Sequence, residues 1–229
     1  MSNVLLFGSS GQIGSEIKEF FLKNNSRVYC VKRSIDMVES EYDIYWDVFS
    51  SKLPSIKSEK FSSICFAQGL NLNDSVYDFD YEKHIELYKV NSLLIVIAIN
   101  KLLRMDLLER PAKICIISSV WQDIARQDKM SYCISKSSLR GLVNSLSVDL
   151  GKEGHLINAI LPGAIDTEMT RANLSENQLK KITDQTFFKK LSDIKDIAKL
   201  CYFLCGNDNS SITGQFINID LGFSNAKII

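Results

Sequence analysis

The stretch "NVLLFGSSGQIGSEI", residues 3–17, joins an apolar run to a helical pattern through a glycine-rich turn. The run at residues 3–7 predicts a buried strand. Residues 12–24 predict an amphipathic helix, because their apolar side chains recur at helical spacing. Glycines between a strand and a helix allow a tight turn and a close approach of a pyrophosphate, whose charge the helix N-terminus favours. The stretch therefore predicts a dinucleotide site, the alternative being a tight turn without a ligand.

Short strand-like runs and longer helical patterns alternate along the rest of the chain. The expected strands are 27–31, 42–48, 62–69, 112–120, 155–163 and 214–220, and the expected helices are 81–105, 131–151 and a region near 174–206. Such alternation implies right-handed crossovers and a parallel sheet covered by helices on both faces. We therefore expect an α/β fold, a doubly wound (Rossmann) mostly parallel sheet of about seven strands in a single domain spanning residues 1–229.

Composition narrows the class of protein. The chain has 229 residues, 45% of them hydrophobic, and its formal net charge is zero, which argues against a nucleic-acid partner. The longest apolar run, residues 93–99, is far below the roughly 20 residues needed to cross a bilayer. The opening residues lack the pattern of a signal peptide. We expect a cytoplasmic protein without a membrane partner.

The six cysteines do not suggest a metal site. They lie at positions 30, 65, 115, 133, 201 and 205, without a C-x-x-C pair. Cys201 and Cys205 share a helix face, but the sequence shows no nearby histidine or second cysteine pair to complete a zinc site. No metal is predicted.

The end of the second strand indicates the cofactor. NAD sites usually carry an acidic residue here to bind the ribose hydroxyls. This chain has Lys32 and Arg33, followed by Ser34, and an arginine matches a ribose 2′-phosphate in charge and in geometry. NADP is therefore favoured. Asp36 is acidic and leaves NAD as a second candidate cofactor. The alternative to any cofactor contact here is a basic loop with no ligand.

Several ordered motifs give the chain a family resemblance. They are "WDV" at 46–48, "AQG" at 67–69, Asn91 in "KVNSL", "ISSV" at 117–120, Tyr132-x-x-x-Lys136, and "NAILPGAIDTEM" at 158–169. In this order, and with the glycine turn, they resemble the short-chain dehydrogenase/reductase family in its compact single-domain form. The chain is most similar to 3-oxoacyl-carrier-protein reductases.

The resemblance implies four catalytic residues. Tyr132 would be the general acid/base, and Lys136 would lower its pKa and bind the nicotinamide ribose. Ser119 would orient the substrate oxygen, with Ser118 as a neighbouring candidate. Asn91 would hold a water in a proton relay to Lys136.

The resemblance also implies contacts to the cofactor, made by the glycine turn and by segments that follow strands. Besides Tyr132 and Lys136, these residues are Gly8, Ser9, Ser10, Gly11, Gln12, Ile13, Gly14, Arg33, Ser34, Asp47, Val48, Ala67, Gly69, Pro162, Gly163, Ile165 and Thr167.

Two departures from the family pattern keep alternatives open. The G-x-x-G-x-x-G spacing is that of the longer, sugar-nucleotide-modifying branch, although little chain remains here for a sugar-binding domain. The usual Asn-Asn-Ala-Gly is Phe66-Ala67-Gln68-Gly69.

The resulting hypothesis is an NADP(H)-dependent oxidoreductase that transfers hydride between nicotinamide and a small carbonyl or secondary alcohol, with a carrier-bound substrate left open. The alternatives are a sugar-modifying enzyme of polysaccharide or secondary-metabolite synthesis and a non-catalytic NADP-binding sensor. Residues 168–192, which include Met169, Leu174, Phe187 and Phe188, would be a substrate-covering lid or a purely structural helix pair. By analogy, helices 81–105 and 131–151 would pair in a homodimer or homotetramer.

Overall fold

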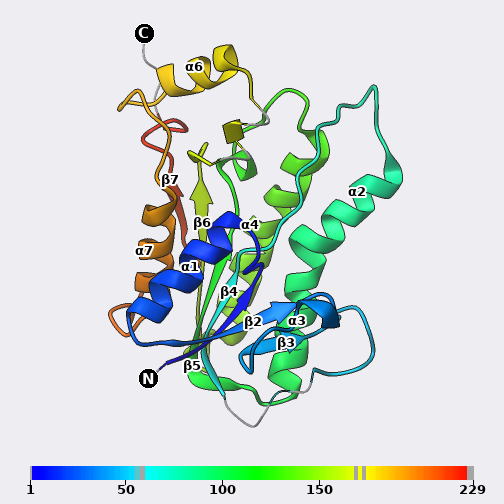
Figure 1. The fold of residues 1–229 in the computed structure, drawn as a ribbon, viewed down its shortest axis with the longest axis vertical. Coiled ribbons are helices and arrows are strands. Elements are labelled where there is room, and N and C mark those ends of the chain that lie inside the picture. Colours follow the sequence, from blue (N-terminus) through cyan, green and yellow to red (C-terminus); the bar gives the residue numbers. More distant parts are fainter. Residues whose placement is uncertain (1, 55, 57–59, 168–169, 172–173, 226–229) are drawn as a thin grey trace.

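A computed structural model describes residues 2–54, 56, 60–167, 170–171 and 174–225, and all its strands form one sheet. The strand order is β3-β2-β1-β4-β5-β6-β7, and every neighbouring pair is parallel (Figure 1). The strands are β1 (Asn3–Phe7), β2 (Arg27–Lys32), β3 (Asp43–Tyr45), β4 (Phe61–Phe66), β5 (Leu108–Ile117), β6 (Leu156–Pro162) and β7 (Phe216–Ile219). The predicted doubly wound parallel sheet is confirmed.

Helices cover both faces of this sheet. On one face lie α1 (Gln12–Lys23) and α7 (Ile194–Cys205), which pack side by side. The other face carries α3 (Leu94–Arg104) and α4 (Met130–Gly151), with α2 (Tyr81–Tyr88) leading into α3. The shorter helices are η1 (Ile35–Met37), η2 (Lys89–Leu93), η3 (Val120–Gln122) and α6 (Glu176–Asp184). No helix in the described part of the chain is both long and apolar enough to span a membrane.

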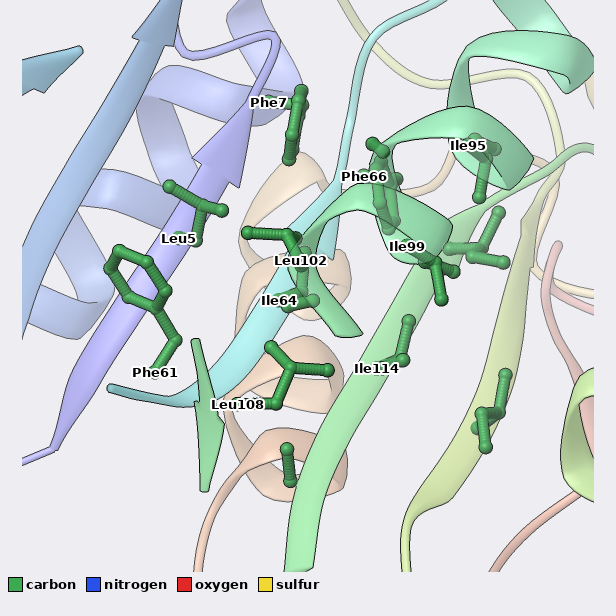
Figure 2. Close-up of a cluster of buried hydrophobic side chains, with 14 of the residues drawn as sticks. Leu5, Phe7, Phe61, Ile64, Phe66, Ile95, Ile99, Leu102, Leu108 and Ile114 are labelled. Atoms are coloured by element: carbon green, nitrogen blue, oxygen red, sulfur yellow. The ribbon is translucent and has the colours of Figure 1, made fainter. Parts of the chain in front are cut away.

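The strands bury side chains on both faces, as expected for central parallel strands. Along β1, Leu5 and Phe7 face α3 and α4, whereas Val4 and Leu6 face α1 and α7. Figure 2 shows the first of these two layers, where the ring of Phe7 stacks on that of Phe66 with centroids 4.7 Å apart. This double burial explains why the strands appear in the sequence as continuous apolar runs.

The second layer contains a cluster of four free thiols, on Cys65, Cys115, Cys201 and Cys205. The sulfur of Cys65 lies 3.5 Å from that of Cys201 and 3.7 Å from that of Cys205. Contacts with these two α7 thiols, together with burial, raise the pKa of Cys65 and of Cys115. Cys65 and Cys115 are register partners on β4 and β5, so the sheet brings a second cysteine pair to α7 that sequence spacing did not reveal.

Several elements differ from their predicted bounds, among them β5, which spans Leu108–Ile117 instead of the predicted 112–120. Strand β3 has only three residues instead of the predicted 42–48, and Trp46 and Val48 beyond its end are buried in the core. The predicted helix 81–105 is interrupted by the π-turn η2, and the region 174–206 divides into α6 and α7.

Candidate functional site

A cavity of about 330 Å³ lies at the carboxyl edge of the sheet, within the usual size range of ligand pockets. Eleven residues predicted to contact cofactor or substrate line it. They are Gly11, Gln12, Ile13, Ala67, Gly69, Ser119, Tyr132, Lys136, Gly163, Ile165 and Thr167. They come from the ends of β1, β4, β5 and β6 and from the start of α4, so the parallel sheet brings together segments far apart in the sequence.

Tyr132 lies in the first turn of α4, half-buried, and lines the cavity. Burial raises the pKa of Tyr132 to about 12, although a hydrogen bond with the Ser119 side chain opposes the shift. The phenol is therefore protonated at neutral pH in the unliganded protein.

Lys136 follows one helical turn later on the same face of α4. Its ammonium group donates a 3.1 Å hydrogen bond to the Ile117 carbonyl oxygen and lies 5.8 Å from the centroid of the Tyr132 ring. The side chain is buried, and burial lowers the pKa of Lys136 to about 8. The arrangement fixes a cation beside the phenol.

The two candidate serines after β5 have different environments. Ser118 is buried, and its hydroxyl donates a 2.8 Å hydrogen bond to Oε1 of Gln122. Ser119 accepts a hydrogen bond from the Trp121 backbone and pairs with the Tyr132 phenol. The hydroxyl of Ser119 is thus the one placed beside the tyrosine.

Asn91 lies in the π-turn η2 and is buried behind the cavity rather than in its lining. Its side chain donates to the Leu70 carbonyl (3.1 Å) and to Ser135 (3.0 Å), and accepts from the Leu70 backbone (2.8 Å). π-Turns often occur at functional sites. Here the turn lets one amide join the loop after β4 to α4, while the predicted water relay to Lys136 stays a prediction.

The three glycines of the turn have different surroundings. Gly8 has a φ of +80°, and a Cβ there would lie 2.5 Å from the Gln68 backbone nitrogen. A Cβ on Gly14 would lie 2.1 Å from the Gly8 carbonyl oxygen, whereas one on Gly11 meets nothing closer than 3.6 Å. Gly8 and Gly14 therefore allow α1 to pack on the turn, and Gly11 leaves the cavity open.

The segments that follow β4 and β6 form the floor and far wall. A Cβ on Gly69 would lie 3.7 Å from the Lys136 ammonium, and one on Gly163 would lie 2.8 Å from Asp220. The Thr167 hydroxyl accepts from the backbone of Thr170. Gly163 thus allows a close approach to Asp220, whereas the distances at Gly69 are ordinary contacts.

The other residues predicted to contact the cofactor do not line the cavity. They are Gly8, Ser9, Ser10, Gly14, Arg33, Ser34, Asp47, Val48 and Pro162. Lys32 forms an ion pair with Asp43 (3.4 Å), whereas the neighbouring Arg33 is exposed. Asp47 is exposed and Val48 is buried in the core. Arg33 is thus the basic side chain left available at the end of β2.

Sequence reasoning missed several lining residues, among them Asn71, Trp121, Arg126 and Lys129, whereas Gln68 lines the cavity as its place in the altered Phe66-Ala67-Gln68-Gly69 segment suggests. Oε1 of Gln68 is buried without a hydrogen-bond partner among the described residues. Lys129 is the N-cap residue of α4, and its backbone is not helical, so no helical spacing signals its position. The loop residues carry no signal either.

The predicted substrate-covering segment is only partly described. Leu174, just before α6, and Ile182 within α6 line the cavity, but Phe187 and Phe188 are exposed. Met169 lies outside the described residues.

Comparison with known proteins gives the family. Residues 61–224 match the family model described as enoyl-(acyl carrier protein) reductase. The chain belongs to the short-chain dehydrogenase/reductase family. It is therefore an oxidoreductase, and the resemblance inferred from the motifs is confirmed.

The chain is similar to 3-oxoacyl-[acyl-carrier-protein] reductases of several bacteria. The one from Buchnera aphidicola subsp. Baizongia pistaciae is 39% identical over 49% of this chain and 46% of that protein. The one from Rickettsia prowazekii is 27% identical over 95% of both.

Solved structures share the fold. A short-chain dehydrogenase family protein from Francisella tularensis has a TM-score of 0.85 at 23% identity, covering 99% of this chain and 100% of that one. A gluconate 5-dehydrogenase from Burkholderia cenocepacia, in complex with NADP and tartrate, has a TM-score of 0.85 at 17% identity, covering 98% and 96%.

Proposed function

We propose that the protein is an NADP(H)-dependent oxidoreductase that interconverts a carbonyl and a secondary alcohol, with Tyr132 as general acid/base. The observation that carries the proposal is the group of Tyr132, Ser119 and Lys136 in one cavity with the glycine turn. A half-buried phenol in the cavity wall is hydrogen-bonded to a serine and lies beside a fixed ammonium group. Each of these contacts has a role in moving a proton to or from an oxygen atom.

In the reductive direction the protein supplies the proton. Ser119 donates a hydrogen bond to the carbonyl oxygen and holds it beside the phenol. The phenolic O–H bond of Tyr132 then breaks as the proton passes to the substrate oxygen, and the Lys136 cation stabilises the phenolate that remains. The bound nicotinamide would supply the hydride that reaches the carbonyl carbon. The pKa of about 12 at Tyr132 favours the protonated form, so the unliganded site is prepared for reduction.

The residues present fit a dinucleotide. Gly11 leaves the turn open to the cavity at the N-terminus of α1, where backbone N–H groups favour a pyrophosphate. The unpartnered Oε1 of Gln68 lies beside it and needs a donor. Arg33 would bind a 2′-phosphate, which favours NADP over NAD. The likeness to an NADP-bound neighbour at 17% identity concerns the fold, so the choice of cofactor rests on Arg33.

The test compares wild type with Tyr132→Phe on a panel of carbonyl compounds with NADPH and NADH. We expect Tyr132→Phe to lower kcat about 10²- to 10⁴-fold while NADPH still binds. Tyr202→Phe is the matched control, because Tyr202 packs against Phe20 and Phe21 between α1 and α7, away from the cavity. Undiminished turnover by Tyr132→Phe would refute the mechanism, and equal use of NADH would refute the role of Arg33.

Two finer features of substrate and assembly complete the proposal. The names of the relatives make a carrier-bound acyl chain one candidate substrate. We also propose one domain over residues 1–229 and a homo-oligomer formed through α3 and α4, where Val96, Ile134 and Val148 are 43%, 48% and 79% exposed. Light scattering that shows only monomer would contradict this assembly.

A further inference from the structure

The cavity extends beyond the residues that the proposed mechanism uses. Past Tyr132, its wall is formed by the loop after β4, by η3 and the loop that follows it, and by α6. The side chains there are Asn71, Trp121, Arg126, Lys129, Leu174 and Ile182. Because the cofactor residues lie on the glycine-turn side, this end is the part left for substrate.

Lys129 is the most unusual of these residues. Its side chain is buried, and its ammonium group lies 5.6 Å from the centroid of the Tyr132 ring. The group donates hydrogen bonds to Oδ1 of Asn71 (2.5 Å) and to the Leu72 carbonyl (3.3 Å). An ammonium group has three donors, so one N–H remains for a ligand.

Arg126 adds a second cation to the same wall. The described lining contains no aspartate or glutamate, and neither Arg126 nor Lys129 forms an ion pair with any described residue. Asp74 lies near Lys129, but its carboxylate accepts from the backbone and hydroxyl of Ser131. A buried cation without an anionic partner is costly to the protein. The wall therefore has two cations beside the reacting group that no described carboxylate contacts directly, although the charge of the nearby Asp74 favours the ammonium form of Lys129.

We propose that this end of the cavity binds an anionic group of the substrate, a carboxylate or phosphate a few bonds from the carbonyl carbon. Lys129 donates its free N–H to the anion, and Arg126 supplies the second donor. The apolar side chains of Trp121, Leu174 and Ile182 exclude water, and the lower dielectric strengthens both contacts. The proposal rests on the proposed function, because it places Tyr132 at the carbonyl.

The test uses matched pairs of probes that differ in charge. Acetoacetate is compared with methyl acetoacetate, and dihydroxyacetone phosphate with dihydroxyacetone. Binding to the NADP-loaded protein is followed by tryptophan fluorescence, because Trp121 lines the cavity, and turnover is followed in parallel with NADPH. The variants are Lys129→Met and Arg126→Gln. Lys152→Met is the control, because this exposed lysine lies at the opposite end of the 22-residue helix α4.

We expect wild type to bind at least one anionic probe roughly 10- to 100-fold more tightly than its neutral partner. Lys129→Met and Arg126→Gln should each weaken the anionic probe by about tenfold and leave the neutral probe nearly unchanged. Lys152→Met should match wild type. The carboxylate and phosphate arms then identify which anion the site prefers.

Equal binding of both members in both pairs would overturn the inference, as would an anion preference that survives in both cavity variants. Because Arg126 has no partner among the described residues, Arg126→Gln tests the site even if Lys129→Met disturbs the loop that Lys129 holds. Failure of the proposed function looks different. In that case Tyr132→Phe retains turnover or NADPH does not bind, whereas the charge preference is read from probe binding, which is also measured on the protein without cofactor.

Discussion

Alanine substitutions at Gly14 and at Gly11 should separate the role of the turn in packing from its role in cofactor binding. A Cβ on Gly14 would lie 2.1 Å from the Gly8 carbonyl oxygen, while a Cβ on Gly11 keeps 3.6 Å from that same atom. Lengthening the first contact to 3.0 Å, below which real Cβ contacts are essentially never found, already requires α1 to move by about 1 Å. Gly8, with a φ of +80°, would be strained by any side chain.

The expected sizes follow from these distances. Overpacking typically costs about 1–3 kcal/mol, so Gly14→Ala should lower the Tm by roughly 2–12 °C for a chain of this length. Gly11 has an extended backbone with a φ of −82°, so Gly11→Ala should leave the Tm near that of wild type. Its methyl group enters the space proposed for the pyrophosphate, so NADPH affinity should fall at least tenfold.

Thermal unfolding and a fluorescence titration with NADPH, applied to both variants, check this reasoning. Two results would refute it: a Gly14→Ala protein that melts with wild type, or a Gly11→Ala protein that binds NADPH normally. The first would show that α1 does not depend on its contact with the turn. The second would remove the turn from the cofactor site.

Three further predictions concern the serines, the buried lysine and the exposed arginine. Ser119→Ala should lower kcat with little change in stability. Ser118→Ala should retain kcat and lower the free energy of unfolding by about 1–3 kcal/mol, because Gln122 loses its buried donor. Kinetics and urea unfolding of both variants check this pair of predictions. Since burial lowers the pKa of Lys136 to about 8, the unfolded chain binds more protons between pH 8 and 10, and the free energy of unfolding rises with pH there. Lys136→Met should show a smaller rise in urea titrations across that window, and an identical rise would contradict the assignment. Arg33→Glu should raise the KM for NADPH more than tenfold and leave the KM for NADH nearly unchanged, which steady-state kinetics with both cofactors would show.

Much of the fold was predictable because parallel strands buried on both faces and amphipathic helices leave clear periodicities. Strand β3 was overestimated because Trp46 and Val48 continue the apolar pattern after the chain has left the sheet. The π-turn at Asn91 was not predicted, since it follows from the pairing of that side chain with Leu70 and Ser135, which are distant in sequence.

The site was predictable where its motifs have fixed order, as at Ser119, Tyr132 and Lys136. It was not predictable where loops meet across the sheet edge. Lys129 reaches Asn71 across 58 positions of sequence, and neither residue belongs to a recognisable pattern. The cysteine cluster was missed for a related reason, because only the strand register places Cys65 and Cys115 side by side.

The four clustered thiols between the sheet and α7 have a practical consequence. Cys65, Cys115 and Cys201 are fully buried and Cys205 nearly so, whereas Cys133 is partly exposed. In the folded chain a thiol-modifying reagent meets Cys133 readily, but it reaches the cluster only when α7 separates from the sheet. The rate at which the four cluster thiols are modified therefore measures how often α7 separates from the sheet. Local unfolding of this helix can be followed in the native sequence without an added label.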